Sequence, residues 1–202
     1  MKGTRNIAII AIAAIVLIFV AWGCSAQRSL VKQDENVGKA WANVNTEYQN
    51  RYNLVDNLVA TVREAANFEQ ETLTNVVKAR ASATAINLTA DDLTPENIAK
   101  MQAAQSQLSG ALSRLLVVSE SYPQLQANKN FLQFQSQLET IENGVRTSVR
   151  SYNDAVASYN VKVRSFPMNL LAGMLGFEKK ATFTAEPGAE KAPSVRDAFN
   201  KK

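Results

Sequence analysis

Residues 131–166 read FLQFQSQLETIENGVRTSVRSYNDAVASYNVKVRSF, and this stretch carries the most regular pattern in the chain. Large apolar side chains stand at seven-residue intervals: Phe131, Leu138, Val145, Tyr152, Tyr159 and Phe166. A second stripe widens the same face with Val149, Val156 and Val163. A strict repeat of seven is typical of an α-helix that supercoils gently against partner helices. The stretch therefore predicts one long helix with a single buried face.

The sequence before this stretch predicts two further helices. From about Asp34 to Ala85, apolar residues recur at steps of three, four or seven, which predicts one straight helix of roughly 75 Å. Thr94 is then a suitable N-cap, with Pro95 at the first helical position of the next helix. That helix is expected to end close to Pro123, which can itself open the following one.

Short connections between these helices favour antiparallel neighbours. The predicted fold is therefore all-α: an up-and-down antiparallel bundle of long helices, in which the first helix projects beyond the others. Residues 167–177, PMNLLAGMLGF, are expected to form a short helix that closes the bundle, or else a docking or membrane-surface element. The bundle domain is predicted over residues 27–180, and residues 181–202 are predicted to be an extended or disordered tail.

An uncharged run of 20 residues, Ile7 to Ala26, precedes the bundle and reads IAIIAIAAIVLIFVAWGCSA. As a helix it would be about 30 Å long, the thickness of a bilayer's hydrocarbon core. Residues 1–26 are therefore predicted to be a membrane anchor that crosses once. The favoured fate is an uncleaved anchor. The alternatives are lipidation at Cys24 after signal removal, against which Trp22 is a departure from the usual lipoprotein pattern, and a cleaved secretory signal.

Flanking charge sets the expected orientation. Lys2 and Arg5 precede the apolar run, whereas Arg28 and Lys32 follow it, so the positive-inside bias is small. It favours a cytoplasmic N-terminus and a bundle on the extracytoplasmic, periplasmic side. Apart from the two N-terminal charges, basic and acidic residues nearly balance. Without a basic block interleaved with aromatics, no nucleic-acid partner is expected.

Several short motifs follow one another in a specific order: KAWANV at 39–44, DNLV at 56–59, AR at 79–80, ESYPQL at 120–125, NFL at 130–132, EN at 142–143, RSYNDAV at 150–156, YN at 159–160, and FP to GF over 166–177. Together they resemble the LemA family of bacterial membrane proteins, from about Leu30 to Phe199. The resemblance implies an N-terminal anchor on a helical bundle, and it carries over no catalytic residue. The family usually has a proline where this chain has Asp56, and its loss favours a straight first helix.

Ionisable residues in the apolar stripes are the candidate site residues. Glu69 and Glu142 fall in these stripes, as do Arg51 and Arg80. Because buried charges need partners, we expect ion pairs that hold the register of the helices. The alternative is a proton or metal site at Glu69 and Glu142. The chain has no histidine, which removes histidine-based triads and imidazole metal sites.

A second pattern is the repeat Tyr152-Asn153 and Tyr159-Asn160, seven residues apart. The first interpretation is contact between packed helices, and the second is a ridge that binds a partner, which would require exposure.

These observations favour a membrane-anchored, non-enzymatic scaffold or adaptor that presents its helices to another envelope protein. No catalytic residue, cofactor or metal is expected. The alternatives are a carboxylate-based or metal-dependent envelope enzyme, and a structural homo-oligomer that associates through the projecting first helix.

Overall fold

The computed structural model describes residues 2–64 and 68–184, with side chains from Ile10 onward. This part of the chain is helical and contains no strand, which confirms the all-α prediction. Its helices are α1 (Lys2–Arg63), α2 (Gln70–Thr84), α3 (Pro95–Ser119), α4 (Pro123–Gln126), α5 (Lys129–Arg164) and α6 (Met168–Leu175).

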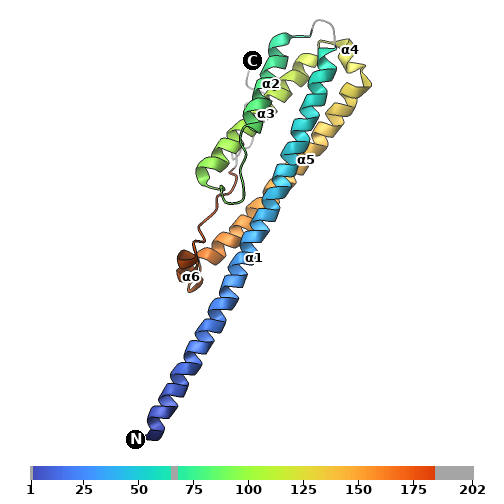
Figure 1. Ribbon diagram of the computed structural model, residues 1–202. Helices are drawn as coiled ribbons and strands as arrows, with labels where there is room; N and C mark the ends of the chain where they lie inside the picture. Colours follow the sequence, from blue (N-terminus) through green and yellow to red (C-terminus); the bar gives the residue numbers. More distant parts are fainter. Residues whose placement is uncertain (1, 65–67, 185–202) are drawn as a thin grey trace, which may run out of the picture.

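The long helices α1 and α5 lie side by side and form the main seam of the bundle (Figure 1). The hairpin of α2 and α3 packs beside the upper half of α1, and the short α4 leads from α3 into α5. The lower half of α1 projects alone beyond the other helices. The predicted up-and-down bundle with an overhanging first helix is therefore confirmed.

The two halves of α1 meet different surroundings. In the lower half, large apolar residues from Ile10 to Val20 are 54–69% exposed. In the upper half, one face is buried against the other helices and includes Val37, Trp41, Val44, Val55, Leu58 and Val62. By length and composition α1 can cross a membrane, and it is the one helix in the described residues that can.

The prediction of one straight helix from Asp34 to Ala85 is wrong. Helix α1 ends at Arg63, and α2 starts at Gln70 and folds back as a separate helix. A straight continuation would carry Leu73 and Val76 beyond the end of the bundle, whereas the hairpin buries them to 4% and 0% exposure. An apolar stripe that keeps its phase through a hairpin looks, in sequence, like the stripe of one longer helix.

The starts of α3 and α5 follow ordinary capping chemistry. The Thr94 hydroxyl accepts a hydrogen bond from the Asn97 backbone N–H at 3.3 Å, which confirms the predicted N-cap. The Asn128 side chain caps α5 by accepting from Asn130 at 2.9 Å and from Phe131 at 3.3 Å.

Five of the six seven-spaced residues of α5 are buried, as the repeat predicts, but the last one is not. Phe166 lies beyond the end of α5 and is 81% exposed. Pro167 follows it, and a residue before proline is disfavoured in helical geometry. Helix α5 therefore ends at Arg164, two residues before Phe166, which is the last residue of the seven-residue repeat.

Residues 168–175 form the predicted short helix, α6, which packs against α1 and α5 through the buried Ala172. The helix ends at Leu175, and the next residue, Gly176, has a φ of 77°, in the left-handed region that glycine adopts without strain. From there a non-helical segment, residues 177–184, returns along the bundle toward α3. The rest of the predicted tail lies outside the described residues, and the predicted domain boundaries stay predictions.

Candidate functional site

A buried arginine lies at the centre of the bundle. Arg51 of α1 is 2% exposed, and its Nη2 donates to Oε2 of Glu142 on α5 at 2.6 Å. Its Nη1 donates to Oε1 of Gln105 on α3 at 3.0 Å and to the Ser109 hydroxyl at 3.5 Å. The guanidinium also lies 5.8 Å from the centre of the Tyr48 ring. One side chain thus ties three helices together.

The hydrogen bonds continue from Gln105, through Tyr52, to one further helix, α2. Gln105 Nε2 donates to the Tyr52 hydroxyl at 2.5 Å, and that hydroxyl donates to the Ala83 carbonyl of α2 at 3.3 Å. Burial raises the pKa of Tyr52, although Gln105 and Arg51 act in the opposite direction. We call Arg51, Tyr52, Gln105 and Glu142 the Arg51 network. It joins α1, α2, α3 and α5.

The other two candidate ionisable residues have partners of their own. Arg80 pairs with Asp56 at 2.5 Å and also donates from Nε to the Tyr52 carbonyl at 3.3 Å. Glu69 precedes α2 and accepts a hydrogen bond from the Thr72 hydroxyl at 3.0 Å. The structure thus brings Arg51 and Glu142 together, but it gives Glu69 and Glu142 different neighbours. Over residues 2–64 and 68–184, no three or more acidic, cysteine or histidine residues gather as potential metal ligands.

Cys24, the candidate lipidation site, is exposed on α1. The helix passes through it without a break, so anchor and bundle are joined by one continuous helix. The state of its thiol in the cell stays a prediction.

The Tyr–Asn repeats of α5 hold the segment that follows α6. Asn153 donates to the Phe183 carbonyl at 3.0 Å and accepts from the Phe183 N–H at 2.9 Å. Asn160 does the same with Lys180, at 2.8 Å and 3.0 Å. We call Tyr152, Asn153, Tyr159 and Asn160 the Tyr–Asn clamp.

The two tyrosines of the clamp add one hydrogen bond each. Tyr152 donates to the Ala181 carbonyl at 2.7 Å, and Tyr159 donates to the Glu178 carbonyl at 2.8 Å. Burial raises the pKa of both hydroxyls, that of Tyr159 to about 12. The protonated hydroxyl is therefore the form that the folded chain favours.

The spacing of the clamp explains why it fits an extended segment. Seven residues of helix advance about 10.5 Å at 1.5 Å each. Three residues of extended chain cover about the same distance at ~3.3–3.5 Å each. The two asparagines, seven apart, therefore meet Phe183 and Lys180, three apart and in reverse order. Because the contacts are to main-chain atoms, the register follows from geometry.

Side chains of the segment add specificity. Phe183 packs beside the Trp41 and Tyr152 rings, with ring centres 6.2 and 5.6 Å away. Lys180 Nζ pairs with Asp34 at 2.8 Å and donates to the Ala90 carbonyl at 2.9 Å. The first interpretation made from sequence placed the two tyrosines in the core, where Tyr152 is 0% and Tyr159 1% exposed. Neither interpretation identified the main chain of residues 178–183 as the partner of the clamp. A buried tyrosine followed by an amide, repeated after seven residues, is the signal that could have revealed it.

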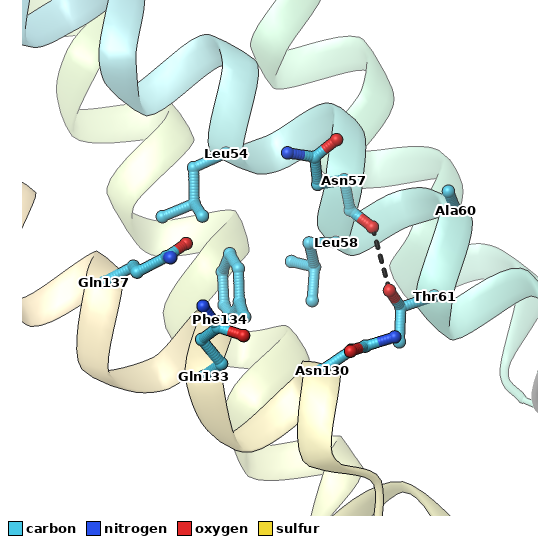
Figure 2. Close-up of a pocket in the computed structure, with 9 residues that line it drawn as sticks. All are labelled: Leu54, Asn57, Leu58, Ala60, Thr61, Asn130, Gln133, Phe134 and Gln137. Carbon is cyan, nitrogen blue, oxygen red and sulfur yellow. Dashed lines mark hydrogen bonds between the residues drawn. The ribbon is translucent and has the colours of Figure 1, made fainter.

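A groove on the outer side of the α1–α5 seam is a second candidate site (Figure 2). It has a volume of about 410 Å³, and a neighbouring hollow of about 360 Å³ shares Leu54, Asn57 and Gln137 with it. Leu58 and Phe134 are the other large apolar residues of the first hollow. The two hollows, which we call the amide groove, are lined by no charged residue, and their polar lining residues are Asn50, Asn53, Asn57, Thr61, Asn130, Gln133, Ser136, Gln137 and Thr140.

Known proteins resemble this chain over most of the bundle. The LemA family model matches residues 40–196. Protein LemA of Metamycoplasma hominis is 30% identical over 119 residues, which cover 59% of this chain and 51% of that protein. Magnetosome protein MamQ 2 of Paramagnetospirillum magneticum is 30% identical over 87 residues, 43% of this chain and 32% of the relative. MamQ of Magnetospirillum gryphiswaldense is 26% identical over a stretch of the same length.

The matched stretches thus span about half or a third of these relatives' own length. The relatives and the apolar N-terminal helix together support a location at the membrane. The family match covers well over half of the chain, in agreement with the ordered motifs that run from the first helix to the segment after α6. The chain belongs to the LemA family.

Proposed function

We propose that this protein is a membrane-anchored, non-enzymatic scaffold or adaptor of the bacterial cell envelope. Its bundle holds a surface at a set distance from the bilayer and presents it to another envelope protein. The side of the membrane follows from Lys2 and Arg5, which favour a cytoplasmic N-terminus and an extracytoplasmic bundle.

The observation that carries this proposal is the unbroken α1, which runs from Lys2 to Arg63. A flexible tether would let the bundle move freely, whereas one helix transmits position from the anchor to the bundle. From Ala26 to Arg63 the helix rises about 56 Å at 1.5 Å per residue. A continuous helix of this length suits a protein that must present a binding surface at a fixed distance from the membrane.

The distribution of polar groups favours the same role. The buried ionisable side chains of the Arg51 network bond to one another, and the clamp bonds to the chain itself. The amide groove differs, because it is uncharged and its asparagine and glutamine side chains are exposed. Amides can donate and accept, so a groove with an apolar floor and amide walls suits another protein's polar backbone.

Site-specific photocrosslinking in cells tests the scaffold role. A photoreactive residue at Gln137 or Asn57, in the amide groove, is expected to yield one discrete adduct in the full-length protein. The matched control is Asn75, an exposed amide on α2 away from the groove. The partner is identified by mass spectrometry, and Gln137→Lys should abolish its adduct with the probe at Asn57.

Four outcomes would contradict this proposal. The absence of adducts at both groove positions, or equal labelling at Asn75, would remove the groove as the presented surface. An adduct between two copies of this chain would support the structural homo-oligomer instead. A stoichiometric metal ion in the purified full-length protein would favour the metal-dependent enzyme.

The anchor can be tested separately. The intact N-terminal mass shows whether Cys24 is free, lipidated or removed with a signal. Protease access to the bundle in spheroplasts, compared with inverted vesicles, reports the side on which it lies. A lipidated or cleaved N-terminus would replace the rod by a tether and contradict the fixed-height argument.

A further inference from the structure

Helix α6 exposes apolar side chains on the side that the bundle does not cover. Leu170 is 62% exposed and Met174 84%, while Phe166, just before the helix, is 81% exposed. The opposite side packs on the bundle through Ala172, which is 1% exposed. Asn169 is the one polar residue among the eight of α6. A helix that is apolar on both sides is poorly suited to an aqueous surface.

The position of α6 along α1 indicates what covers this face. Figure 1 shows α6 beside α1, just above the half of that helix that projects alone. The exposed apolar surface of α1 extends from Ile10 to Val20, and its first buried residues are Ala26 and Leu30. Leu30 lies only about 6 Å further along the helix than Ala26. The exposed face of α6 is therefore placed next to the end of the apolar run.

The charged residues that precede α6 are basic, whereas Glu178 follows it and Asp34 and Asp91 share a hollow with Leu175 at its C-terminal end. Lys162 and Arg164 stand directly before the turn into α6, and Arg28 and Lys32 follow the apolar run of α1. Between Lys162 and Phe177 there is no acidic residue. Basic side chains that flank apolar ones are typical of elements at the headgroup level of a membrane.

We propose that α6, together with Phe166, inserts into the interfacial layer of the bilayer that α1 crosses. The protein then contacts the membrane at two places, the span and this second element beside it. A single span leaves the rod free to rotate about its axis and to tilt. A second, laterally displaced contact restricts both motions, and so fixes which face of the bundle points along the membrane.

Fluorescence quenching in reconstituted full-length protein tests this proposal. Cys24→Ser removes the native thiol, and Met174→Cys then takes an environment-sensitive fluorophore. The matched control is Val117→Cys, a 65% exposed site in the last turn of α3. This end of α3 leads into α4, which lies at the opposite end of the bundle from α6 (Figure 1). In vesicles of phosphatidylcholine and phosphatidylglycerol that contain headgroup-nitroxide lipid, we expect several-fold stronger quenching at position 174 than at 117.

A second variant keeps the test independent of the label site. Adding Leu170→Glu to the labelled Met174→Cys protein places a charge on the same exposed face. Because Leu170 contributes little to the core, helical content should stay unchanged while quenching falls to the level of position 117. Equal quenching at 174 and 117 would overturn the proposal. So would a shielded label that lipid quenchers do not reach and that depends on protein density, since a second copy would then cover α6.

Discussion

The Arg51 network and the Tyr–Asn clamp both place polar groups inside the bundle, but they do so with different chemistry. The network holds an ionised guanidinium that is 2% exposed, and it joins helices to one another. The clamp consists of neutral amides and hydroxyls, and it joins a helix to the main chain of an extended segment. The Arg51 network is stable only if its buried charges balance, whereas the Tyr–Asn clamp forms only if the spacing of the helix matches that of the extended segment.

This difference sets how each cluster should respond to change. A buried charge that loses its counter-charge remains buried and unsatisfied, which is costly. A neutral amide that is removed leaves backbone groups that water can reach once the segment moves. We therefore expect single changes in the network to destabilise the whole bundle, whereas changes in the clamp should first release residues 178–184.

Alkaline pH is expected to have the largest effect, since it acts on both clusters. Burial raises the pKa values of Tyr48, Tyr52, Tyr152 and Tyr159 above the ordinary 10.0. Above pH 10 the unfolded chain therefore binds fewer protons than the folded one, and stability falls as pH rises. Within the clamp, Tyr159, with a pKa of about 12, should ionise before Tyr152, whose pKa burial raises further, so the hydrogen bond to the Glu178 carbonyl should be lost first.

The measurement is tyrosinate absorbance together with circular dichroism of the detergent-solubilised full-length protein as pH is raised. Ionisation of these tyrosines near pH 10 with helical content intact would contradict the burial argument.

Glu142→Leu tests the network. The change leaves the Arg51 charge buried without a counter-charge, and we expect a loss of about 2–3 kcal/mol in the free energy of unfolding, because Glu142 is itself partly exposed. The double variant Arg51→Met, Glu142→Leu should recover most of that loss, since no charge then remains buried. Urea denaturation followed by circular dichroism measures both. Equal destabilisation by the single and double variants would show that packing, and not charge, dominates at this position.

Asn153→Ala combined with Asn160→Ala tests the clamp. Four hydrogen bonds to the segment disappear, and we expect a cost of about 2 kcal/mol with release of residues 178–184. Limited proteolysis should then cut next to Lys179 or Lys180, and Trp41 fluorescence should change as Phe183 leaves. Asn143→Ala, an exposed amide on the same helix, is the control. Cleavage at the same rate in both variants would argue against a clamp.

Tyr159→Phe should give the smallest effect. The ring stays in the core, and only the hydrogen bond to the Glu178 carbonyl is lost, for about 1 kcal/mol. Because Glu178 is exposed, water can replace that bond. The midpoint of thermal unfolding should fall by a few degrees, and the alkaline transition should move upward. A loss as large as that of Glu142→Leu would remove the distinction between the two clusters.

Much of the local structure could be predicted from particular residues. The seven-residue repeat predicts α5, Thr94 with Pro95 predicts the start of α3, and Pro123 predicts where α3 stops; the helix that Pro123 opens is the short α4, however, and α5 starts separately at Lys129. Each of these signals acts within one or two helical turns. The break between α1 and α2 could not be predicted from the apolar pattern, because both helices of a hairpin need an apolar face and the phase is kept across the turn.

The candidate sites, too, could be predicted from sequence only in part. That Arg51 and Glu142 fall in buried stripes could be predicted, but their contact, across a separation of 91 residues in sequence, could not. The clamp was still less predictable: the repeated Tyr–Asn pair marks the side of α5 that forms it, but its partner is the backbone of residues 178–183, which carries no signal of its own in sequence. The amide groove likewise exists only where the outer sides of α1 and α5 meet.

Sequence by itself determined the length of the apolar N-terminal run, the helical class and the buried face of the long helices, because these depend on spacing along one chain. Tertiary structure decided where α1 ends, which charge Arg51 meets, what the Tyr–Asn repeat binds and how α6 lies beside α1. These outcomes depend on contacts between residues far apart in sequence, and the free energy of such contacts is realised only once the helices pack.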